Sequence, residues 1–147
     1  MKESTAEKYL LYADDDIDDI EMVQEMIQQI DPSLKLITFT DGIELINYLK
    51  GLPKDTVLPC FILLDMNMPQ YDGIKTLRLL KAENTLAEIP VVMFSTSGED
   101  IDVNRALAYG AKTYITKPVR SVELAKIVTS FTEYCQAQPI YKKQDDN

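Results

Sequence analysis

Acidic residues stand where two apolar segments of this chain end. Asp14 and Asp15 directly follow one such segment near the N-terminus, and Asp65 follows another, with Asn67 two residues later. Carboxylates that lie within a few ångströms raise one another's pKa unless a cation neutralises them, and Mg²⁺ prefers hard oxygen ligands. An acidic run can also be an exposed helix start, where negative charge is favourable. The strand-end position of Asp65 favours a Mg²⁺ site.

A hydroxyl and an ammonium follow two later apolar segments. Ser95 ends the stretch that begins at Pro90, and Lys117 stands before Pro118 at the end of another stretch. A phosphoryl group bound at a carboxylate needs charge neutralisation and hydrogen-bond donors, which Mg²⁺, a lysine and a hydroxyl can supply. A single serine or lysine at such a position is usually a turn residue or solvated. The joint placement of these groups therefore carries the prediction of phosphoryl chemistry.

Five short apolar segments have the length and composition of strands. They are Tyr9–Ala13, Leu36–Phe39, Cys60–Leu64, Pro90–Phe94 and Thr113–Thr116. Between them, apolar residues recur at helical spacing, as at Ile20, Val23 and Ile27. Alternating apolar strands and amphipathic helices predict an α/β fold of (βα)5 type, a doubly wound parallel sheet with right-handed crossovers. Ligands of such sheets bind outside the carboxyl ends of the strands.

Capping residues support this alternation. Asp41 with Glu44, and Ser97 with Asp100, fit a side-chain acceptor followed three residues later by a carboxylate that can reach back. Gly110 fits the position just after the end of a helix.

Length and composition limit the class of protein. The 147 residues allow one domain, with a core expected over residues 8–136 and a mobile tail over 137–147. A net charge of −9 gives no general attraction to nucleic-acid phosphates, so direct DNA binding is not expected. No apolar run reaches the roughly 20 residues of a membrane helix, and no signal-peptide segment is present. We expect a cytoplasmic protein without a membrane segment.

Histidine and cysteine usage narrows the chemistry further. The chain has no histidine, which excludes Ser-His-Asp and Cys-His nucleophilic pairs, His-ligated zinc and a histidine phosphoacceptor within it. Its two cysteines, Cys60 and Cys135, lie in apolar stretches without a CxxC partner. Buried, reduced thiols are therefore expected rather than a disulfide or a zinc site.

From about Lys8 to about Gln136, the chain resembles a stand-alone, single-domain response-regulator receiver of two-component signalling. The motifs are Leu10-Leu11-Tyr12-Ala13-Asp14-Asp15-Asp16, Leu63-Leu64-Asp65-Met66-Asn67-Met68-Pro69 with Gly73, Pro90-Val91-Val92-Met93-Phe94-Ser95, and Lys117-Pro118. The separations between Asp65, Ser95 and Lys117 also fit compact members of that family. The resemblance implies a flavodoxin-like sheet with strand order 2-1-3-4-5.

The resemblance also implies which residues accept the phosphoryl group and hold the metal. Asp65 would take a phosphoryl group from a phosphohistidine on a histidine kinase or phosphotransfer protein, or from a small phosphodonor. Mg²⁺, or Mn²⁺ in its place, would be held by Asp14, Asp15, Asp65 and the backbone carbonyl of Asn67.

Three further positions would respond to phosphorylation. Ser95 and Lys117 would contact the phosphoryl oxygens, and the peptide between Lys117 and Pro118 would be cis. Phosphorylation adds roughly 1.5 to 2 negative charges. We expect Ser95 to be drawn to them and Tyr114 to enter the vacated space. This switch would change the face made by the fourth helix, fifth strand and fifth helix.

Several positions depart from the common receiver pattern. Ser95 stands where threonine is more usual, Thr96 where a small residue is usual, and Asp14 where glutamate is frequent. The effect of Thr96 beside the pocket has no predicted size. The loop 50–59 and the acidic start of the first predicted helix resemble stand-alone receivers that accompany phytochrome-type and other hybrid kinases. Only a short tail follows the last helix, so output is expected through a protein effector, from a monomer or a phosphorylation-linked homodimer.

Three other functions fit parts of the pattern. A metal-dependent phosphohydrolase with an aspartyl-phosphate intermediate typically needs an acid two residues after the nucleophile, where this chain has Asn67. A docking module could keep the receiver fold without phosphorylation. A flavin-binding protein of the same fold needs a phosphate-binding loop after the first strand, where this chain has three aspartates. The receiver, which is not a turnover enzyme, is the preferred reading.

Overall fold

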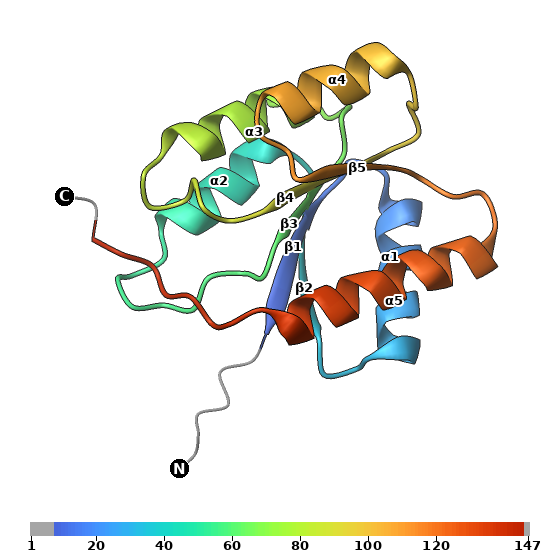
Figure 1. Ribbon diagram of the computed structural model, residues 1–147, viewed down its shortest axis with the longest axis horizontal. Coiled ribbons are helices and arrows are strands. Elements are labelled where there is room, and N and C mark those ends of the chain that lie inside the picture. Colours follow the sequence, from blue (N-terminus) through green and yellow to red (C-terminus); the bar gives the residue numbers. More distant parts are fainter. Residues whose placement is uncertain (1–7, 146–147) are drawn as a thin grey trace.

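The computed structural model describes residues 8–145, which form five strands and five helices in alternation (Figure 1). The strands are β1 (Tyr9–Ala13), β2 (Lys35–Phe39), β3 (Ile62–Leu64), β4 (Val91–Ser95) and β5 (Thr113–Thr116). The helices are α1 (Ile17–Ile30), α2 (Gly42–Lys50), α3 (Gly73–Ala82), α4 (Asp100–Ala108) and α5 (Ser121–Ala137). All strand pairs are parallel in the order β2-β1-β3-β4-β5, which confirms the predicted doubly wound sheet.

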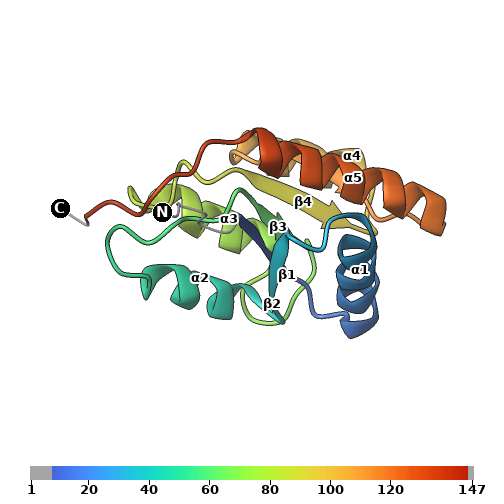
Figure 2. The same cartoon turned by 90° about the horizontal axis from the view of Figure 1, so that it is seen from below.

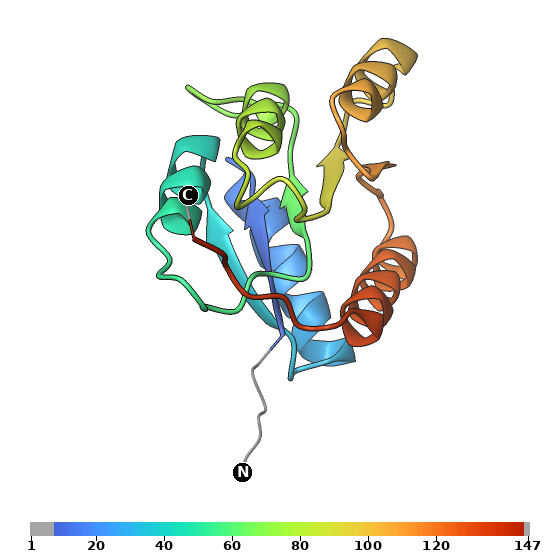
Figure 3. The same ribbon diagram turned by 60° about the vertical axis from the view of Figure 1, so that its left-hand side comes forward.

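Helices cover both faces of the sheet (Figures 1 and 3). Helices α2, α3 and α4 lie on one face, where Leu45 and Leu77 belong to the same hydrophobic core as Leu11 of β1. Helices α1 and α5 lie together on the other face (Figures 2 and 3), where Val23 and Val128 join a separate core. Every residue of β1 is buried, because a central parallel strand has no face in water. No helix in residues 8–145 is long and apolar enough to cross a membrane.

The central strands fix the position of the candidate site. β1 pairs with β2 on one side and with β3 on the other, so the chain order reverses between them. The backbone N–H of Asp14 donates to the carbonyl of Phe39 at 3.0 Å, and that of Asp65 donates to the carbonyl of Ala13 at 3.0 Å. These bonds hold both acids one residue beyond their strands, in the crevice where ligands of this fold bind.

The predicted cap at Asp41 is confirmed, with one change of partner. Asp41 accepts a hydrogen bond from the backbone N–H of Glu44 at 3.0 Å and so caps α2. The carboxylate of Glu44 reaches the N–H of Thr40, at 3.1 Å, rather than that of Asp41. Gly110 follows the C-cap of α4 with φ 107°, a left-handed conformation that suits glycine, as predicted.

The predicted cap at Ser97 is wrong. Helix α4 begins at Asp100, and its N-cap residue Glu99 makes no side-chain capping bond. The hydroxyl of Ser97 donates instead to a carboxylate oxygen of Asp102 at 2.6 Å. A carboxylate inside the first turn is a stronger acceptor than the backbone offers, which explains why the hydroxyl turns toward it.

The C-terminal segment is packed where a mobile tail was expected from residue 137 onward. Val57 and Lys142 form an isolated antiparallel bridge, and the segment crosses the loop before β3 (Figure 3). Lys143 is buried, and its ammonium donates to three carbonyls at the end of α2. These belong to Leu49 (3.1 Å), Lys50 (3.0 Å) and Leu52 (2.7 Å). Carbonyls of a last helical turn lack partners within the helix, so the ammonium of Lys143 supplies donors to this end of α2. Residues 146 and 147 lie outside the described residues.

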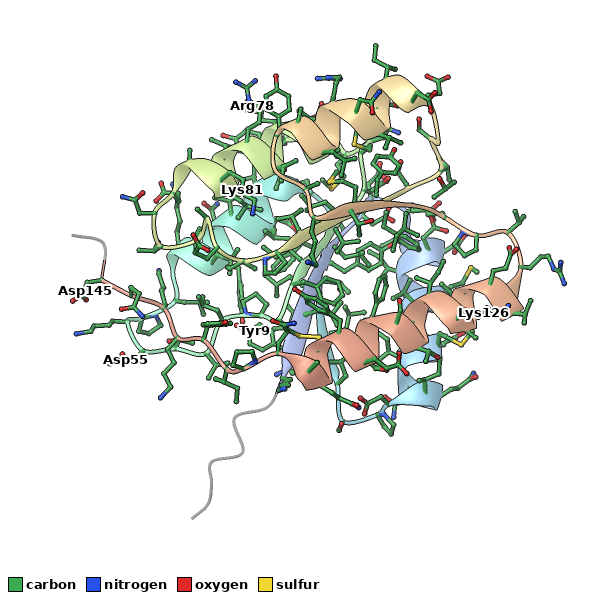
Figure 4. All side chains as sticks on the ribbon, in the orientation of Figure 1. Tyr9, Asp55, Arg78, Lys81, Lys126 and Asp145 are labelled. Carbon is green, nitrogen blue, oxygen red and sulfur yellow. A yellow bond between two sulfur atoms is a disulfide. The ribbon has the colours of Figure 1, made fainter. Side chains whose placement is uncertain are left out.

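The expectation of reduced thiols is also wrong. Cys60, just before β3, and Cys135, near the end of α5, form a disulfide although 75 positions separate them (Figure 4). Their Cα atoms are 5.5 Å apart, within the usual range for a disulfide. The fold brings the end of its last helix over the start of a central strand, a proximity that spacing in the sequence does not indicate.

Candidate phosphorylation and metal site

Three of the predicted acids meet at the carboxyl edge of the sheet. Asp14, Asp15 and Asp65 each offer a carboxylate oxygen, and these oxygens lie within 4.8 Å of one another. Asp14 is 0% exposed and Asp65 is 6% exposed, whereas Asp15 faces solvent. Hard oxygen ligands of this kind, with one side open to water, fit Mg²⁺ or Mn²⁺. Asn67 lies exposed on the loop that follows, two residues beyond Asp65.

Hydrogen bonds fix the orientation of the buried carboxylate of Asp14. One of its oxygens accepts from the hydroxyl of Tyr12 at 2.6 Å, and the other accepts from the backbone N–H of Asp16 at 2.9 Å. Burial, followed by the charge of Asp14, raises the pKa of Tyr12 far above its usual range. The phenol therefore stays protonated and remains a donor to Asp14. Sequence reasoning places Tyr12 only in an apolar strand and misses this role.

One ammonium group lies among these carboxylates. The Nζ atom of Lys117 lies 2.7 Å from a carboxylate oxygen of Asp14, 2.7 Å from one of Asp19 and 3.6 Å from one of Asp65. Burial alone would lower the pKa of Lys117, but hydrogen bonds to Asp14 and Asp19 outweigh it and raise the pKa above its usual range. Lys117 is therefore a permanent cation beside Asp65, as the predicted phosphoryl contact requires.

Asp19 is a residue of the site that sequence reasoning missed. Its carboxylate shares Lys117 with Asp14, although Asp19 belongs to the first turn of α1 rather than to a strand end. In the sequence it stood only as part of an acidic helix start. Its position shortly after the Asp14–Asp15 pair could have indicated that Asp19 belongs to the site. A helix that follows directly after a strand keeps its first turn near the edge of the sheet.

Asp65 carries a perturbed carboxyl group. Burial, followed by the charge of Asp14, raises its pKa to about 6, while Lys117 and the hydroxyl of Ser95 act in the opposite direction. The cluster therefore holds more negative charge than one lysine neutralises. A divalent cation or a bound donor with positive charge would relieve this repulsion.

Ser95 and Tyr114 lie at the same edge, farther along the sheet. Ser95 is fully buried at the end of β4, while Thr96 is exposed. The half-buried Tyr114 donates from its hydroxyl to the carbonyl of Ser97 at 2.6 Å. Burial raises the pKa of Tyr114, against hydrogen bonds with Ser95 and Ser97 that lower it, so this donor is retained at neutral pH. The two predicted switch residues are thus connected through the loop that follows β4.

The peptide between Lys117 and Pro118 is trans, which corrects the expected cis bond. The trans isomer is favoured by about 0.5–1 kcal/mol for a bond before proline. In this geometry the backbone N–H of Lys117 already donates to the carbonyl of Ser95 at 2.8 Å. The ammonium also reaches Asp14 and Asp65. Lys117 therefore reaches the site with this peptide in the trans form.

Comparison with known proteins defines the family. Residues 10–129 match the response regulator receiver domain. Response regulator Rcp1 of Synechocystis sp. is 31% identical over 134 residues, which cover 90% of this chain and 91% of Rcp1. The chain belongs to the response regulator receiver family, whose members act in two-component signalling.

Two solved structures are similar along nearly their whole length. The phosphorylated cyanobacterial phytochrome response regulator RcpA matches with a TM-score of 0.81 and 30% identity, covering 92% of this chain and 99% of RcpA. The Mn²⁺-bound form of Rcp1 matches with a TM-score of 0.76 and 29% identity, covering 91% of this chain and 99% of Rcp1. The family consists of signalling proteins, and a divalent cation occupies the structure of one similar member.

Proposed function

We propose that Asp65 is the phosphoacceptor of this receiver. The supporting observation is the placement of Lys117, which lies 3.6 Å from Asp65 and shares the edge with two further acids. A carboxylate oxygen of Asp65 would attack the phosphorus of a phosphohistidine. The O–P bond forms as the N–P bond breaks, and the imidazole leaves with a proton from solvent. Lys117 and Ser95 would then donate hydrogen bonds to the phosphoryl oxygens.

The metal ligands in this proposal are Asp14, Asp15, Asp65 and the backbone carbonyl of Asn67. Bound Mg²⁺, or Mn²⁺, supplies neutralisation of the charge that develops on the transferring group. Tyr12 and the N–H of Asp16 hold Asp14 in one orientation, so its carboxylate would not need to reorganise when the metal enters. The exposed Asp15 leaves the site open to an incoming donor.

The output proposed for the phosphorylated state runs through Ser95 and Tyr114. If Ser95 turns toward the phosphoryl group, the loop after β4 moves, and the bond from Tyr114 to the Ser97 carbonyl must break. Tyr114 would then enter the space beside Ser95 and alter the face formed by α4, β5 and α5. Ile101 and Leu107 are exposed on α4, where an effector protein could contact them.

The partners follow from the same proposal. The likeness to RcpA supports a histidine kinase or phosphotransfer protein of phytochrome-type or hybrid signalling as the donor. We also propose one domain for the chain, a cytoplasmic location, no direct contact with DNA, and action as a monomer or a phosphorylation-linked homodimer. Turnover of phosphate esters is not part of the proposal, because Asn67 stands where a phosphohydrolase would need an acid.

Trapping the phosphorylated residue tests this proposal. The protein is incubated with Mg²⁺ and acetyl phosphate, reduced with borohydride, which converts an aspartyl phosphate to homoserine, and mapped by peptide mass spectrometry. We expect the modification at Asp65 alone, at no more than one equivalent, and no sustained release of phosphate. Modification of Asp14 or Asp15 instead, or continuing turnover of a phosphate ester, would overturn the assignment.

A further inference from the structure

A second chemically reactive group lies at the opposite edge of the sheet. Cys60 stands at the amino side of β3, whereas Asp65 follows the carboxyl end of the same strand. Cys135 stands near the end of α5, whereas this helix begins at Ser121, soon after Lys117. The disulfide therefore joins the far ends of a strand and a helix that both lead from the proposed phosphorylation site.

The disulfide lies in the wall of a surface cavity. The cavity has a volume of about 370 Å³, and its lining includes Lys8, Pro59, Cys60, Cys135 and Ile140. Cys60 is partly exposed, whereas Cys135 is only 1% exposed. Both cysteines line the cavity, but Cys60 is the more exposed residue, so a thiol that enters reaches Cys60 more readily. Accessibility is one of the properties that make a disulfide reducible.

A lysine supplies positive charge beside the less accessible cysteine. Lys8 donates from Nζ to three carbonyls that end α5, at Cys135 (2.8 Å), Gln136 (2.9 Å) and Gln138 (2.7 Å). A cation near a cysteine favours the thiolate form, which is the form in which sulfur leaves during exchange.

The disulfide also ties together two segments that meet beyond it. After α5, the chain runs back along the loop before β3. There the backbone N–H of Lys143 donates to the carbonyl of Thr56 at 2.8 Å. Leu58 donates to the carbonyl of Tyr141 at 2.9 Å, only two residues before Cys60. The bridge thus closes the base of the contact between loop 55–59 and segment 139–143.

We propose that Cys60 and Cys135 form a reversible redox site, opened by a dithiol reductant of the thioredoxin class that enters through this cavity. In the disulfide state, the end of α5 and segment 139–145 are docked on the loop before β3. In the dithiol state, these segments open more often. The inference is independent of phosphorylation at Asp65.

Reduction of the disulfide takes place in two thiol–disulfide exchanges. A thiolate of the reductant attacks Cys60 Sγ, the bond between Cys60 and Cys135 breaks, and Cys135 leaves as a thiolate that takes up a proton. The second thiol of the reductant then attacks the reductant's first sulfur atom, which is bonded to Cys60 in the mixed disulfide. Cys60 is released as a thiol. The protein gains two electrons and two protons, and the reductant becomes a disulfide.

Hydrogen exchange measured by mass spectrometry on the full chain tests the proposal. The oxidised protein is compared with protein reduced by thioredoxin under native conditions. We expect a mass gain of two hydrogen atoms and severalfold faster exchange in peptides from the end of α5, segment 139–145 and loop 52–58. A double variant, Cys60→Ser with Cys135→Ser, should exchange like the reduced protein and show no response to thioredoxin.

A trapping experiment tests the point of entry. Thioredoxin that lacks its second cysteine should remain attached to Cys60, with Cys135 free for alkylation. The inference is overturned if native protein resists thioredoxin, if attachment occurs at Cys135, or if reduction leaves exchange unchanged. Repeating the exchange measurement on Asp65→Asn separates the two proposals, because the redox response should persist there even if Asp65 is not the phosphoacceptor.

Discussion

The two edges of the sheet differ in how their polar groups are satisfied. At the carboxyl edge, Asp14, Asp19 and Asp65 share the ammonium of Lys117, and negative charge remains in excess. At the amino edge, Lys8 and Lys143 each donate to three backbone carbonyls, so each ammonium there meets neutral acceptors rather than carboxylates. The carboxyl edge therefore favours the binding of a cation, whereas the hydrogen bonds of the amino edge stabilise the fold.

This difference shows how a small domain separates reactivity from stability. A cluster of like charges around Asp65 lowers the stability of the fold until a cation neutralises part of that charge. The covalent bond and the capped helix ends lie away from that cluster, on the same strand and helix. Substitutions at the two edges should therefore change stability in opposite directions.

The largest expected effect is the loss of the disulfide. The bond closes a loop of 75 residues, for which chain entropy predicts a stabilisation of about 4 kcal/mol. Urea unfolding of oxidised and reduced protein should differ by that amount, and the double variant Cys60→Ser with Cys135→Ser should match the reduced form. Equal unfolding midpoints for the oxidised and reduced proteins would show that the disulfide does not stabilise the fold.

Replacement of Asp65 should raise the free energy of unfolding, whereas loss of the disulfide lowers it. The pKa of Asp65 is raised to about 6, so the stability it contributes is present while it is protonated and is lost as the pH rises through 6. In metal-free protein, Asp65→Asn should match wild type near pH 4 and exceed it by about 2–3 kcal/mol at pH 7. Urea unfolding across this pH range, with a chelator present, measures the difference.

Added Mg²⁺ provides the control for Asp65. Because the cation binds the folded wild-type site, it should stabilise wild type more than Asp65→Asn and narrow the difference at pH 7. A difference that is independent of pH, or a variant less stable than wild type at pH 7, would contradict the proposed charge repulsion at the carboxyl edge.

A smaller loss is expected from removing the lysine that caps α2. Lys143→Met removes the ammonium that bonds to three carbonyls, two of which belong to Lys50 and Leu52, and should cost about 2 kcal/mol in the free energy of unfolding. Lys142→Met is the matched control, since the neighbouring Lys142 is exposed and its loss should change stability by less than about 0.5 kcal/mol. Equal effects of the two variants would refute the capping role.

The smallest expected effect concerns the bond between Tyr114 and the loop after β4. Tyr114→Phe removes one hydrogen bond to the Ser97 carbonyl and should cost about 1 kcal/mol. We also expect faster amide exchange in residues 96–100, with exchange in β1 unchanged. Unchanged exchange in that loop would separate Tyr114 from Ser95 and weaken the proposed switch.

Much of the carboxyl edge was predictable from the sequence. Asp14, Asp65, Ser95 and Lys117 each stand at or near the end of an apolar strand, and parallel strands bring their carboxyl ends to one edge. Strand alternation alone was therefore enough to gather these residues. Asp19 was not predictable in this way, because its contact depends on how α1 leaves the sheet.

The amino edge was poorly predicted, because its contacts join segments far apart in the chain. The disulfide depends on the length and tilt of α5, which places Cys135 over Cys60. The buried Lys143 reads as an ordinary tail residue until the end of α2 is located. The expected cis peptide at Pro118 came from resemblance rather than from any local requirement, and the trans bond serves the site.

Intact-protein mass spectrometry shows whether Asp65 accepts a phosphoryl group at a metal-assisted site. The protein is treated with a small phosphodonor, with and without Mg²⁺, beside Asp65→Asn and the distant control Asp145→Asn. We predict a single phosphoryl adduct on wild type and on Asp145→Asn that requires Mg²⁺, and none on Asp65→Asn. An adduct that persists in Asp65→Asn, or forms equally in the presence of a chelator, would contradict the account.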